Sequence, residues 1–168
     1  MERAIRTKKV MMNGKTYNVD LLQDEYETIQ NEVDICKLNG WDFQKMLNRL
    51  PHWTRKYWPE VAAECWEKSD PHIEVGTKAT EILYSDRRAK TVVKVISPKE
   101  IVVAENETKC IDYFASKYEI LDTIAEYMGQ ETYTLRRNGT WVAKGQPKKN
   151  GSVFLIVGMH DHYIDPSF

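Results

Sequence analysis

The residues of this chain that point most directly at a partner are cations near its C-terminal end. Between Thr132 and His160 the sequence contains neither Asp nor Glu. Its basic residues in this stretch are Arg136, Arg137, Lys144, Lys148 and Lys149. Guanidinium and ammonium groups bind phosphates and release counterions from nucleic acid, so a folded stretch of one charge sign predicts a surface for nucleic acid or an acidic partner. A solvated hairpin face is the alternative interpretation.

A second basic group, Arg87, Arg88 and Lys94, would join the first if two hairpins lie side by side. For Arg87 a structural ion pair with Asp86 or with a terminal carboxylate is an alternative role. Trp141 and Tyr133 interleave with the C-terminal cations and could stack on bases, although their alternation also favours core positions. The residues expected to bind nucleic acid or a partner are Arg87, Arg88, Lys94, Arg136, Arg137, Trp141, Lys144, Lys148 and Lys149.

Catalytic chemistry has little support in the sequence. His160-Asp161-His162 is the one cluster with metal-like content, but a metal site needs three or four ligands of fixed geometry. Ser85 and Cys110 have no recognisable base nearby, and no phosphate-binding glycine loop occurs. We therefore expect no enzyme, cofactor or metal. A metal-dependent nuclease built on these two histidines and Asp161 is the alternative.

Composition indicates a folded protein outside the membrane. The chain has 168 residues, a formal net charge of −1 and 42% hydrophobic residues, and no apolar run approaches the ~20 residues of a membrane span. The basic start MERAIRTKKV lacks the apolar stretch of a secretory signal, which favours the cytoplasm. Three cysteines without a C-x-x-C pair, Cys36, Cys65 and Cys110, favour reduced, buried thiols.

The first 70 residues have helical periodicity. One apolar stripe runs through Leu22, Tyr26, Ile29, Val33 and Cys36, and Asp20 is the expected N-cap of this helix, which ends near Lys37. A second helix is expected over 41–50, with Asp42 near its start and Pro51 as its stop. A third begins at Pro59 and ends before Ser69-Asp70-Pro71, the expected domain boundary.

Beyond that boundary the period changes to two. Strands are expected over 80–84, 91–96, 100–104, 132–137, 140–144 and 153–157. Asn138-Gly139 predicts a tight hairpin between two of them. Residues 111–128 fit a helix or a strand, and we favour a strand followed by a turn. The sequence therefore predicts an α+β protein, with a three-helix unit over 1–70 and a small antiparallel β barrel, SH3-like or OB-like, over 72–168.

Several short motifs carry a resemblance that covers about residues 76–168. They are Ala79-Thr80, Tyr84-Ser85-Asp86-Arg87, Thr91-Val92-Val93-Lys94-Val95, Thr134-Leu135-Arg136-Arg137-Asn138-Gly139, Trp141-Val142 and the closing Tyr163-Ile164-Asp165-Pro166-Ser167-Phe168. Together they resemble a family of small proteins encoded by bacteriophages and prophages. The resemblance implies a phage setting and no particular mechanism. In the closing motif, Phe168 is expected to pack against the barrel.

In a phage setting, small accessory proteins often block host machinery. We therefore expect a phage-encoded inhibitor of a host nucleoprotein defence complex, of the anti-CRISPR type, that acts in the host cytoplasm through a basic β face. A general nucleic-acid-binding module is the alternative, and a nuclease is the third. The tryptophan-rich span around His52-Trp53, Tyr57-Trp58 and Trp66 predicts either a protein-binding patch or the core of the helical unit.

Overall fold

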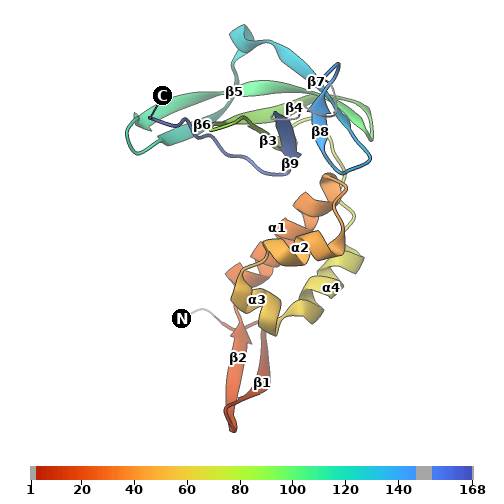
Figure 1. Cartoon of the computed structure of the whole chain (residues 1–168), viewed down its shortest axis with the longest axis vertical. Helices are drawn as coiled ribbons and strands as arrows, with labels where there is room; N and C mark the ends of the chain where they lie inside the picture. The colour runs from red at the N-terminus through yellow and green to blue at the C-terminus, as the bar shows by residue number, and fades with distance from the viewer. Residues whose placement is uncertain (1–2, 147–152, 168) are drawn as a thin grey trace. The chain divides into compact units, whose positions relative to one another are not determined.

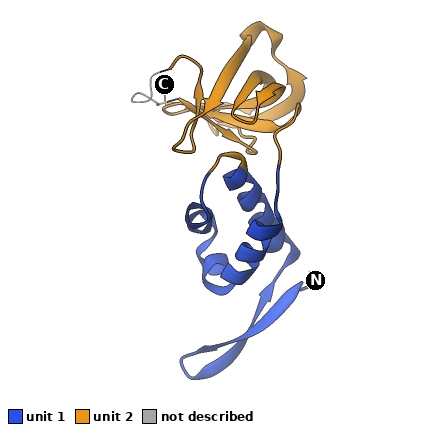
Figure 2. Ribbon diagram, turned by 90° about the vertical axis from the view of Figure 1, so that its right-hand side faces the viewer, with its two compact units in different colours: residues 1–37, 41–71 blue, residues 38–40, 72–168 orange. Residues whose placement is uncertain are grey.

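The computed structural model describes residues 3–146 and 153–167, which form two compact units (Figure 2). Unit 1 consists of residues 1–37 and 41–71, and unit 2 of residues 38–40 and 72–168. The fold is mixed α+β, with four α-helices and a closed antiparallel barrel of six strands (Figure 1). No helix in the described ranges is both long and apolar enough to cross a membrane.

Unit 1 opens with a β-hairpin and continues with helices. Its elements are β1 (Arg6–Met12), β2 (Lys15–Leu21), α1 (Gln23–Leu38), α2 (Phe43–Arg49), α3 (His52–Tyr57) and α4 (Pro59–Lys68). The sequence analysis missed the hairpin, although its signal is present. Asn13 and Gly14 both have positive φ, 51° and 74°, and join Met12 to Lys15 in the two-residue turn that Asn-Gly favours.

The apolar stripe of the first helix is confirmed, because Ile29, Val33 and Cys36 are all buried. Its expected N-cap is wrong. Asp20 lies in β2, where its carboxylate accepts a hydrogen bond from the Thr7 hydroxyl at 2.6 Å. The helix start is instead capped from within, since the Glu25 carboxylate accepts the backbone N–H of Leu22 at 3.0 Å.

The helical unit has one helix more than expected. Asp42 caps α2, as predicted, by accepting the backbone N–H of Lys45 at 2.8 Å. Pro51 ends α2 and is followed directly by the short helix α3, residues 52–57. Pro59 then occupies the first turn of α4. The three-helix prediction is therefore wrong in number. Proline stopped one helix and at the same time permitted the next to begin.

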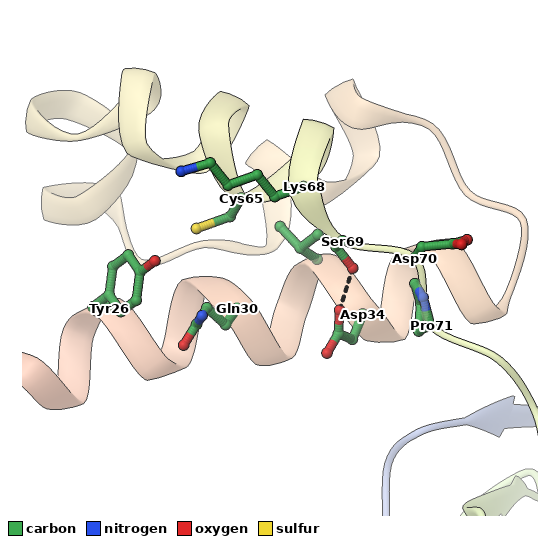
Figure 3. A pocket seen from close by; sticks show the side chains of 9 residues that line it. Tyr26, Gln30, Asp34, Cys65, Lys68, Ser69, Asp70 and Pro71 are labelled. Carbon is green, nitrogen blue, oxygen red and sulfur yellow. Dashed lines mark hydrogen bonds between the residues drawn. The ribbon is translucent and has the colours of Figure 1, made fainter.

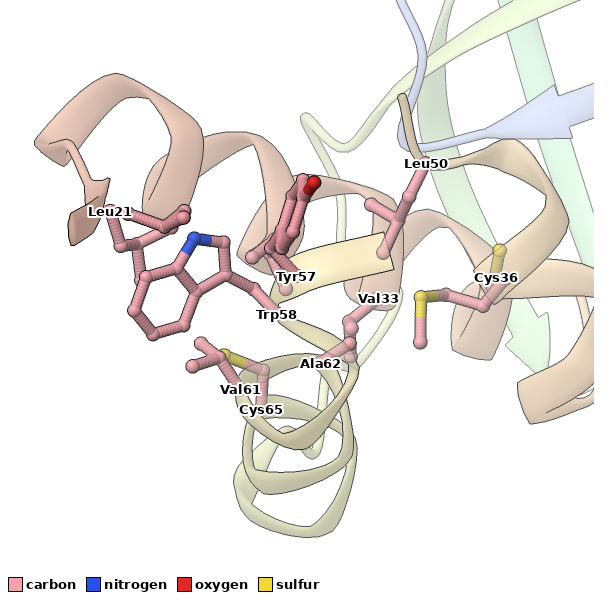
Figure 4. Close-up of a cluster of buried hydrophobic side chains, with 12 residues drawn as sticks. Leu21, Val33, Cys36, Leu50, Tyr57, Trp58, Val61, Ala62 and Cys65 are labelled. Carbon is pink, nitrogen blue, oxygen red and sulfur yellow. The ribbon is translucent and has the colours of Figure 1, made fainter. Parts of the chain in front are cut away.

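Most of the tryptophan-rich span lies in the core of unit 1 (Figure 4). Tyr57 and Trp58 are 4% and 2% exposed and pack with Leu21, Val33 and the buried face of α4. Trp66 packs partly buried against this cluster. Of the tryptophans in this span only Trp53, 47% exposed, presents a substantial surface; its ring lies 4.3 Å from that of Tyr57, and His52 beside it is also exposed. The core interpretation accounts for this span better than a protein-binding patch.

Unit 2 is an antiparallel barrel with one added strand. Its elements are β3 (Lys78–Ile82), β4 (Arg87–Ser97), β5 (Glu100–Asp112), β6 (Lys117–Ile124), the 3-10 helix η1 (Glu126–Met128), β7 (Gln130–Leu135), β8 (Trp141–Ala143) and β9 (Phe154–Val157). The strands pair in the order β4-β3-β9-β8-β7-β5, and β4 also pairs with β5, which closes the barrel. β6 pairs with the far half of β5.

The expected strand pattern is confirmed in outline. The preference for a strand in residues 111–128 is borne out by β6, which follows a turn at 113–116. The hairpin at Asn138-Gly139 has a different turn from the expected one. Only Gly139 of the pair has positive φ, 75°, and its N–H bonds to the Arg136 carbonyl at 3.0 Å. This pattern is a three-residue loop with a bulge, not a two-residue turn.

The barrel interior is apolar along most of its length. Its core contains Ala79, Val92, Ile101, Val103, Tyr133, Trp141, Leu155 and Val157. Residues 38–40, the last residue of α1 and the two after it, belong to this unit. The Asn39 side chain donates to the Val157 carbonyl at 2.8 Å and accepts its N–H at 3.0 Å. The Trp141 indole N–H donates to the Leu38 carbonyl at 3.2 Å.

Candidate partner-binding surface

Backbone pairing brings cations from two hairpins to one end of the barrel. Lys94 pairs across to Val102 on β5, and Val102 pairs on its other side with Thr132 on β7. The carbonyl of Thr132 accepts the backbone N–H of Lys144, and the carbonyl of Lys99 accepts that of Leu135, each at 2.8 Å. We call this surface the cationic end. It consists of Lys94, Lys99, Arg136, Arg137 and Lys144.

Little negative charge opposes this surface. Lys144 forms an ion pair with Glu100 of β5 at 2.6 Å. The stretch without acids in the sequence therefore lies beside one carboxylate in the folded structure. Among the described residues, no carboxylate lies within ion-pair distance of the other four cations. The Nε of Arg136 is buried and has no hydrogen-bond partner among the described residues. The side chain of Arg137 is exposed. The arrangement can bind an anion without first breaking several ion pairs.

The two basic groups of the sequence do not merge completely. Lys94 joins the cationic end, but Arg87 and Arg88 lie about 20 Å away along β4 at the usual strand rise. Arg87 is paired with Asp161 at 2.8 Å, and Arg88 lies 3.9 Å from Glu105. Arg87 thus has the structural ion pair considered as its alternative role, although with Asp161 rather than Asp86.

Trp141 does not belong to the surface. Trp141 and Tyr133 are both 0% exposed and form part of the barrel core, so neither ring can stack on a base in this structure. The reason is the strand alternation, which turns every second side chain of β7 and β8 inward. Lys148 and Lys149, which the sequence analysis also assigned to the surface, lie outside the described residues. Lys99, which it omitted, is an exposed neighbour of the β7–β8 loop.

The sequence analysis also missed a polar cluster in the barrel interior. We call Glu81, Lys90, Glu105, Glu131 and Tyr133 the interior cluster. The ammonium of Lys90 lies 3.6 Å from Glu81 and 3.4 Å from Glu105, and all three side chains are at most 12% exposed. The Tyr133 hydroxyl lies 2.5 Å from the Glu81 carboxylate and 3.1 Å from that of Glu131.

The side chains of the interior cluster form ion pairs and hydrogen bonds with one another, as in a structural ion-pair network. Burial, and next the hydrogen bond to Glu81, raise the pKa of Tyr133, so its hydroxyl keeps its proton and acts as a donor. A hydroxyl has only one proton, so it can donate to only one of the two carboxylates at a time. Glu81 and Lys90 are buried, so their charges depend on this network and are sensitive to substitution, whereas Glu131 is exposed at its edge.

The two histidines of His160-Asp161-His162 lie beside Asn106 and Tyr118. The segment is irregular rather than a strand, and His160 Nε2 lies 3.3 Å from the Asn106 side-chain oxygen. The ring of His162 packs against Tyr118 at 4.9 Å. Burial lowers the pKa of both histidines. Within the described ranges, no three His, Cys, Asp or Glu side chains are grouped so that they could hold a metal ion.

The serine and cysteine side chains considered as nucleophiles differ in exposure. Ser85 donates to Asp86 at 3.2 Å, and Cys110 is exposed on β5, which corrects the expectation that all three thiols are buried. Cys36 and Cys65 are buried and reduced. Burial raises the pKa of Cys36 to about 11 and also raises that of Cys65, so neither is a ready thiolate.

The closing motif fastens the end of the chain to the β3–β4 turn. The Asp86 carboxylate accepts the backbone N–H of Asp165 at 2.9 Å, and Ser116 exchanges hydrogen bonds with the backbone of Ile164. The Asp165 carboxylate in turn accepts the Ser167 N–H at 2.9 Å. These contacts give the quoted motifs a structural role. The expected packing of Phe168 lies outside the described residues.

Unit 1 contains a pocket of about 340 Å³ between α1 and the end of α4 (Figure 3). Tyr26, Gln30 and Asp34 line it from α1, at intervals of four residues. Cys65, Lys68 and Ser69 line the opposite side, and the Ser69 hydroxyl donates to the Asp34 carboxylate. The hydrogen bond from Ser69 already occupies the Asp34 carboxylate. The other side chains that line the pocket differ in charge and polarity, so the pocket favours no ligand class.

Comparison with known proteins adds no further constraint. Neither the protein-family models, nor the curated proteins, nor the solved structures compared with this chain match it.

Proposed function

We propose that this chain is a phage-encoded accessory protein that binds and inhibits a host nucleoprotein defence complex, of the anti-CRISPR type, through the cationic end of its barrel. The phage setting comes from the resemblance of residues 76–168, and it implies action in the bacterial cytoplasm. Such complexes expose both nucleic-acid phosphates and basic channels that hold them. A compact, cation-bearing barrel is suited to contact the phosphates and obstruct the channel.

The observation that carries the proposal is the gathering of cations from separate hairpins. The Lys99 carbonyl accepts the backbone N–H of Leu135, the residue before Arg136, and Lys94 and Lys144 flank the paired residues Val102 and Thr132. Four of the five cations have no carboxylate partner among the described residues. Lys94 lies in β4, and backbone hydrogen bonds hold Lys99, Arg136 and Lys144 in place, which lowers the entropy cost of ordering these cations on binding.

The kind of barrel belongs to the same proposal. We propose an SH3-like or OB-like barrel, since small barrels of these kinds commonly use their strands and loops to bind oligonucleotides or peptides. The closed six-stranded antiparallel sheet is compatible with this assignment.

The test is inhibition of target cleavage by purified RNA-guided nuclease complexes, with the full chain added in a concentration series. The variant is Lys94→Glu with Arg137→Glu, two exposed cations of the cationic end. The matched control is Lys109→Glu with Lys117→Glu, two exposed lysines on β5 and β6. We expect the variant to inhibit at least tenfold less well than the control, because two phosphate or carboxylate contacts are reversed.

Unchanged inhibition by the variant would refute the role of the cationic end. Binding of free DNA or RNA without any inhibition would favour the alternative, a general nucleic-acid-binding module. Four unpaired cations then predict a slope of roughly −3 to −4 in log affinity against log salt for duplex DNA.

A further inference from the structure

The β1–β2 hairpin is the most basic element of unit 1. Residues 3–19 contain Arg3, Arg6, Lys8, Lys9 and Lys15 and no acid. The two strands pair only with each other and form a two-stranded ribbon closed by the tight turn at Asn13 and Gly14. In Figures 1 and 2 the turn end of the ribbon extends past the helices of this unit.

Strand alternation divides these cations between two faces of the ribbon. The inner face packs on the helices, since Val19 and Leu21 belong to the core of unit 1. Arg6 on this face binds Glu64 of α4 through two hydrogen bonds of 2.7 and 3.1 Å, and Lys8 binds Glu60 at 2.8 Å. These two cations fasten the ribbon to the helices and are not available to a partner.

The outer face is polar and faces away from the helices. Its central cross-strand pair is Lys9 with Asn18, followed by Met11 with Thr16 towards the turn. All four residues are exposed, Met11 by 74%. The face has a single carboxylate, Asp20, which already accepts the Thr7 hydroxyl.

Three cations of the ribbon remain without an ion pair. Within the described ranges no carboxylate lies within ion-pair distance of Lys9 on the outer face, Lys15 at the turn or Arg3 before β1. They are spread along the ribbon rather than clustered. At the usual strand rise, Lys9 and Lys15 are about 10 Å apart along the ribbon. This spacing suits the polyanionic edge of a nucleic acid better than one small anion.

The dimensions of the ribbon match one groove of duplex DNA. Strands of seven residues give a ribbon about 23 Å long and, with side chains, roughly 10 Å wide. The major groove of B-form DNA is about 12 Å wide and admits a two-stranded ribbon. The major groove of an RNA duplex is too narrow for side chains to read.

We propose that the β1–β2 ribbon is a DNA-binding arm that enters the major groove of duplex DNA. Its outer face lies towards the bases, where Lys9 and Asn18 supply the side-chain types that bind guanine and adenine edges. Arg3 and Lys15 contact the phosphates on either side. Helices α3 and α4 support the inner face and keep the ribbon extended. This site is separate from the cationic end and does not depend on the function proposed for it.

The experiment is fluorescence anisotropy of a labelled DNA duplex of mixed sequence, of about two helical turns, with the full chain across a salt series. The variant is Lys9→Gln with Asn18→Ala on the outer face. The matched control is Lys68→Gln with Asn48→Ala, which removes the same groups from exposed helical positions of unit 1. Circular dichroism and thermal unfolding check that all proteins fold alike.

We expect the ribbon variant to bind duplex DNA at least tenfold more weakly than the control, because two base contacts are lost, while the salt slope set by the phosphate contacts of Arg3 and Lys15 is kept. We also expect an RNA duplex of the same sequence to bind much more weakly than DNA. Absence of DNA binding at low salt, equal affinity of ribbon variant and control, or equal binding of RNA would each overturn the inference. If only the Lys94→Glu, Arg137→Glu variant loses DNA affinity, the ribbon inference fails while the proposed role of the cationic end stands.

Discussion

Removing the hydroxyl of Tyr133 tests the interior cluster with minimal change to packing. Tyr133→Phe keeps the buried ring, so the apolar area removed from water stays the same. Glu81 loses its hydroxyl donor at 2.5 Å and keeps Lys90 at 3.6 Å as its remaining partner. A hydrogen bond to a charged group contributes about 1.5–3 kcal/mol, so we expect the barrel to lose roughly 2 kcal/mol of stability. For a unit of this size that loss lowers the Tm by roughly 10 °C.

The assay must follow the barrel alone, and the Trp141 indole supplies the signal. Four of the five tryptophans lie in unit 1, whereas Trp141 lies in the barrel core and donates its N–H to the Leu38 carbonyl. Its NMR cross-peak, followed through a urea titration, reports unfolding of unit 2. The control is Tyr127→Phe, because that side chain is 83% exposed and its loss should change stability by less than about 0.5 kcal/mol.

The reasoning is refuted if Tyr133→Phe unfolds within about 0.5 kcal/mol of the wild type. That result would mean that the hydroxyl gains no more from the Glu81 carboxylate than it would from water. A loss well above 3 kcal/mol would instead indicate that Lys90 and the carboxylates rearrange together when the donor is removed.

Three further predictions concern other parts of the chain. Lys90→Met leaves two buried carboxylates without their shared cation and should destabilise the barrel by about 3–5 kcal/mol, measured by the same titration; a neutral effect would show that the network is dispensable. The lowered pKa of His160 and of His162 means that the unfolded chain takes up protons first, so stability is full above about pH 6.5 and is lost as the pH falls through the lower folded values. Urea titrations at pH 7.5 and pH 5 check this sign, and a barrel that is more stable at pH 5 would contradict it. Gly14→Ala forces a side chain into positive φ at 74° and should cost about 1 kcal/mol of unit 1 stability despite the free space around it; calorimetry that shows no loss would mean that the turn relaxes.

Local signals were sufficient to predict much of the fold. The apolar stripe of α1, the Asp42 cap and the period-two strands of the barrel depend on neighbours within a few residues, and all were found. The hairpin at Asn13-Gly14 has an equally local signal, an Asn-Gly pair at positive φ, which the sequence analysis did not use. The analogous signal at Asn138-Gly139 predicted the hairpin correctly and its turn type wrongly, because the longer loop is set by the strands that it joins.

Long-range pairing decided what the sequence could not show. The acid-free stretch from Thr132 to His160 meets Glu100 only because β5 lies beside β7. Trp141 is interleaved with cations in the sequence, but strand alternation turns it into the core. The interior cluster unites side chains from β3, β4, β5 and β7, and each of its charged members alone resembles an ordinary surface residue of a strand.

The three residues 38–40 limit how the two units of this protein can be exchanged or separated as modules. They are encoded more than thirty codons before the first barrel strand, yet they belong to the barrel unit. A barrel transferred to another N-terminal partner by recombination would leave behind the Asn39 amide that pairs with Val157 and the carbonyl that receives the Trp141 indole. Any functional exchange of modules must therefore carry this short segment along or replace it, which ties the inheritance of the barrel to that of the helix before it.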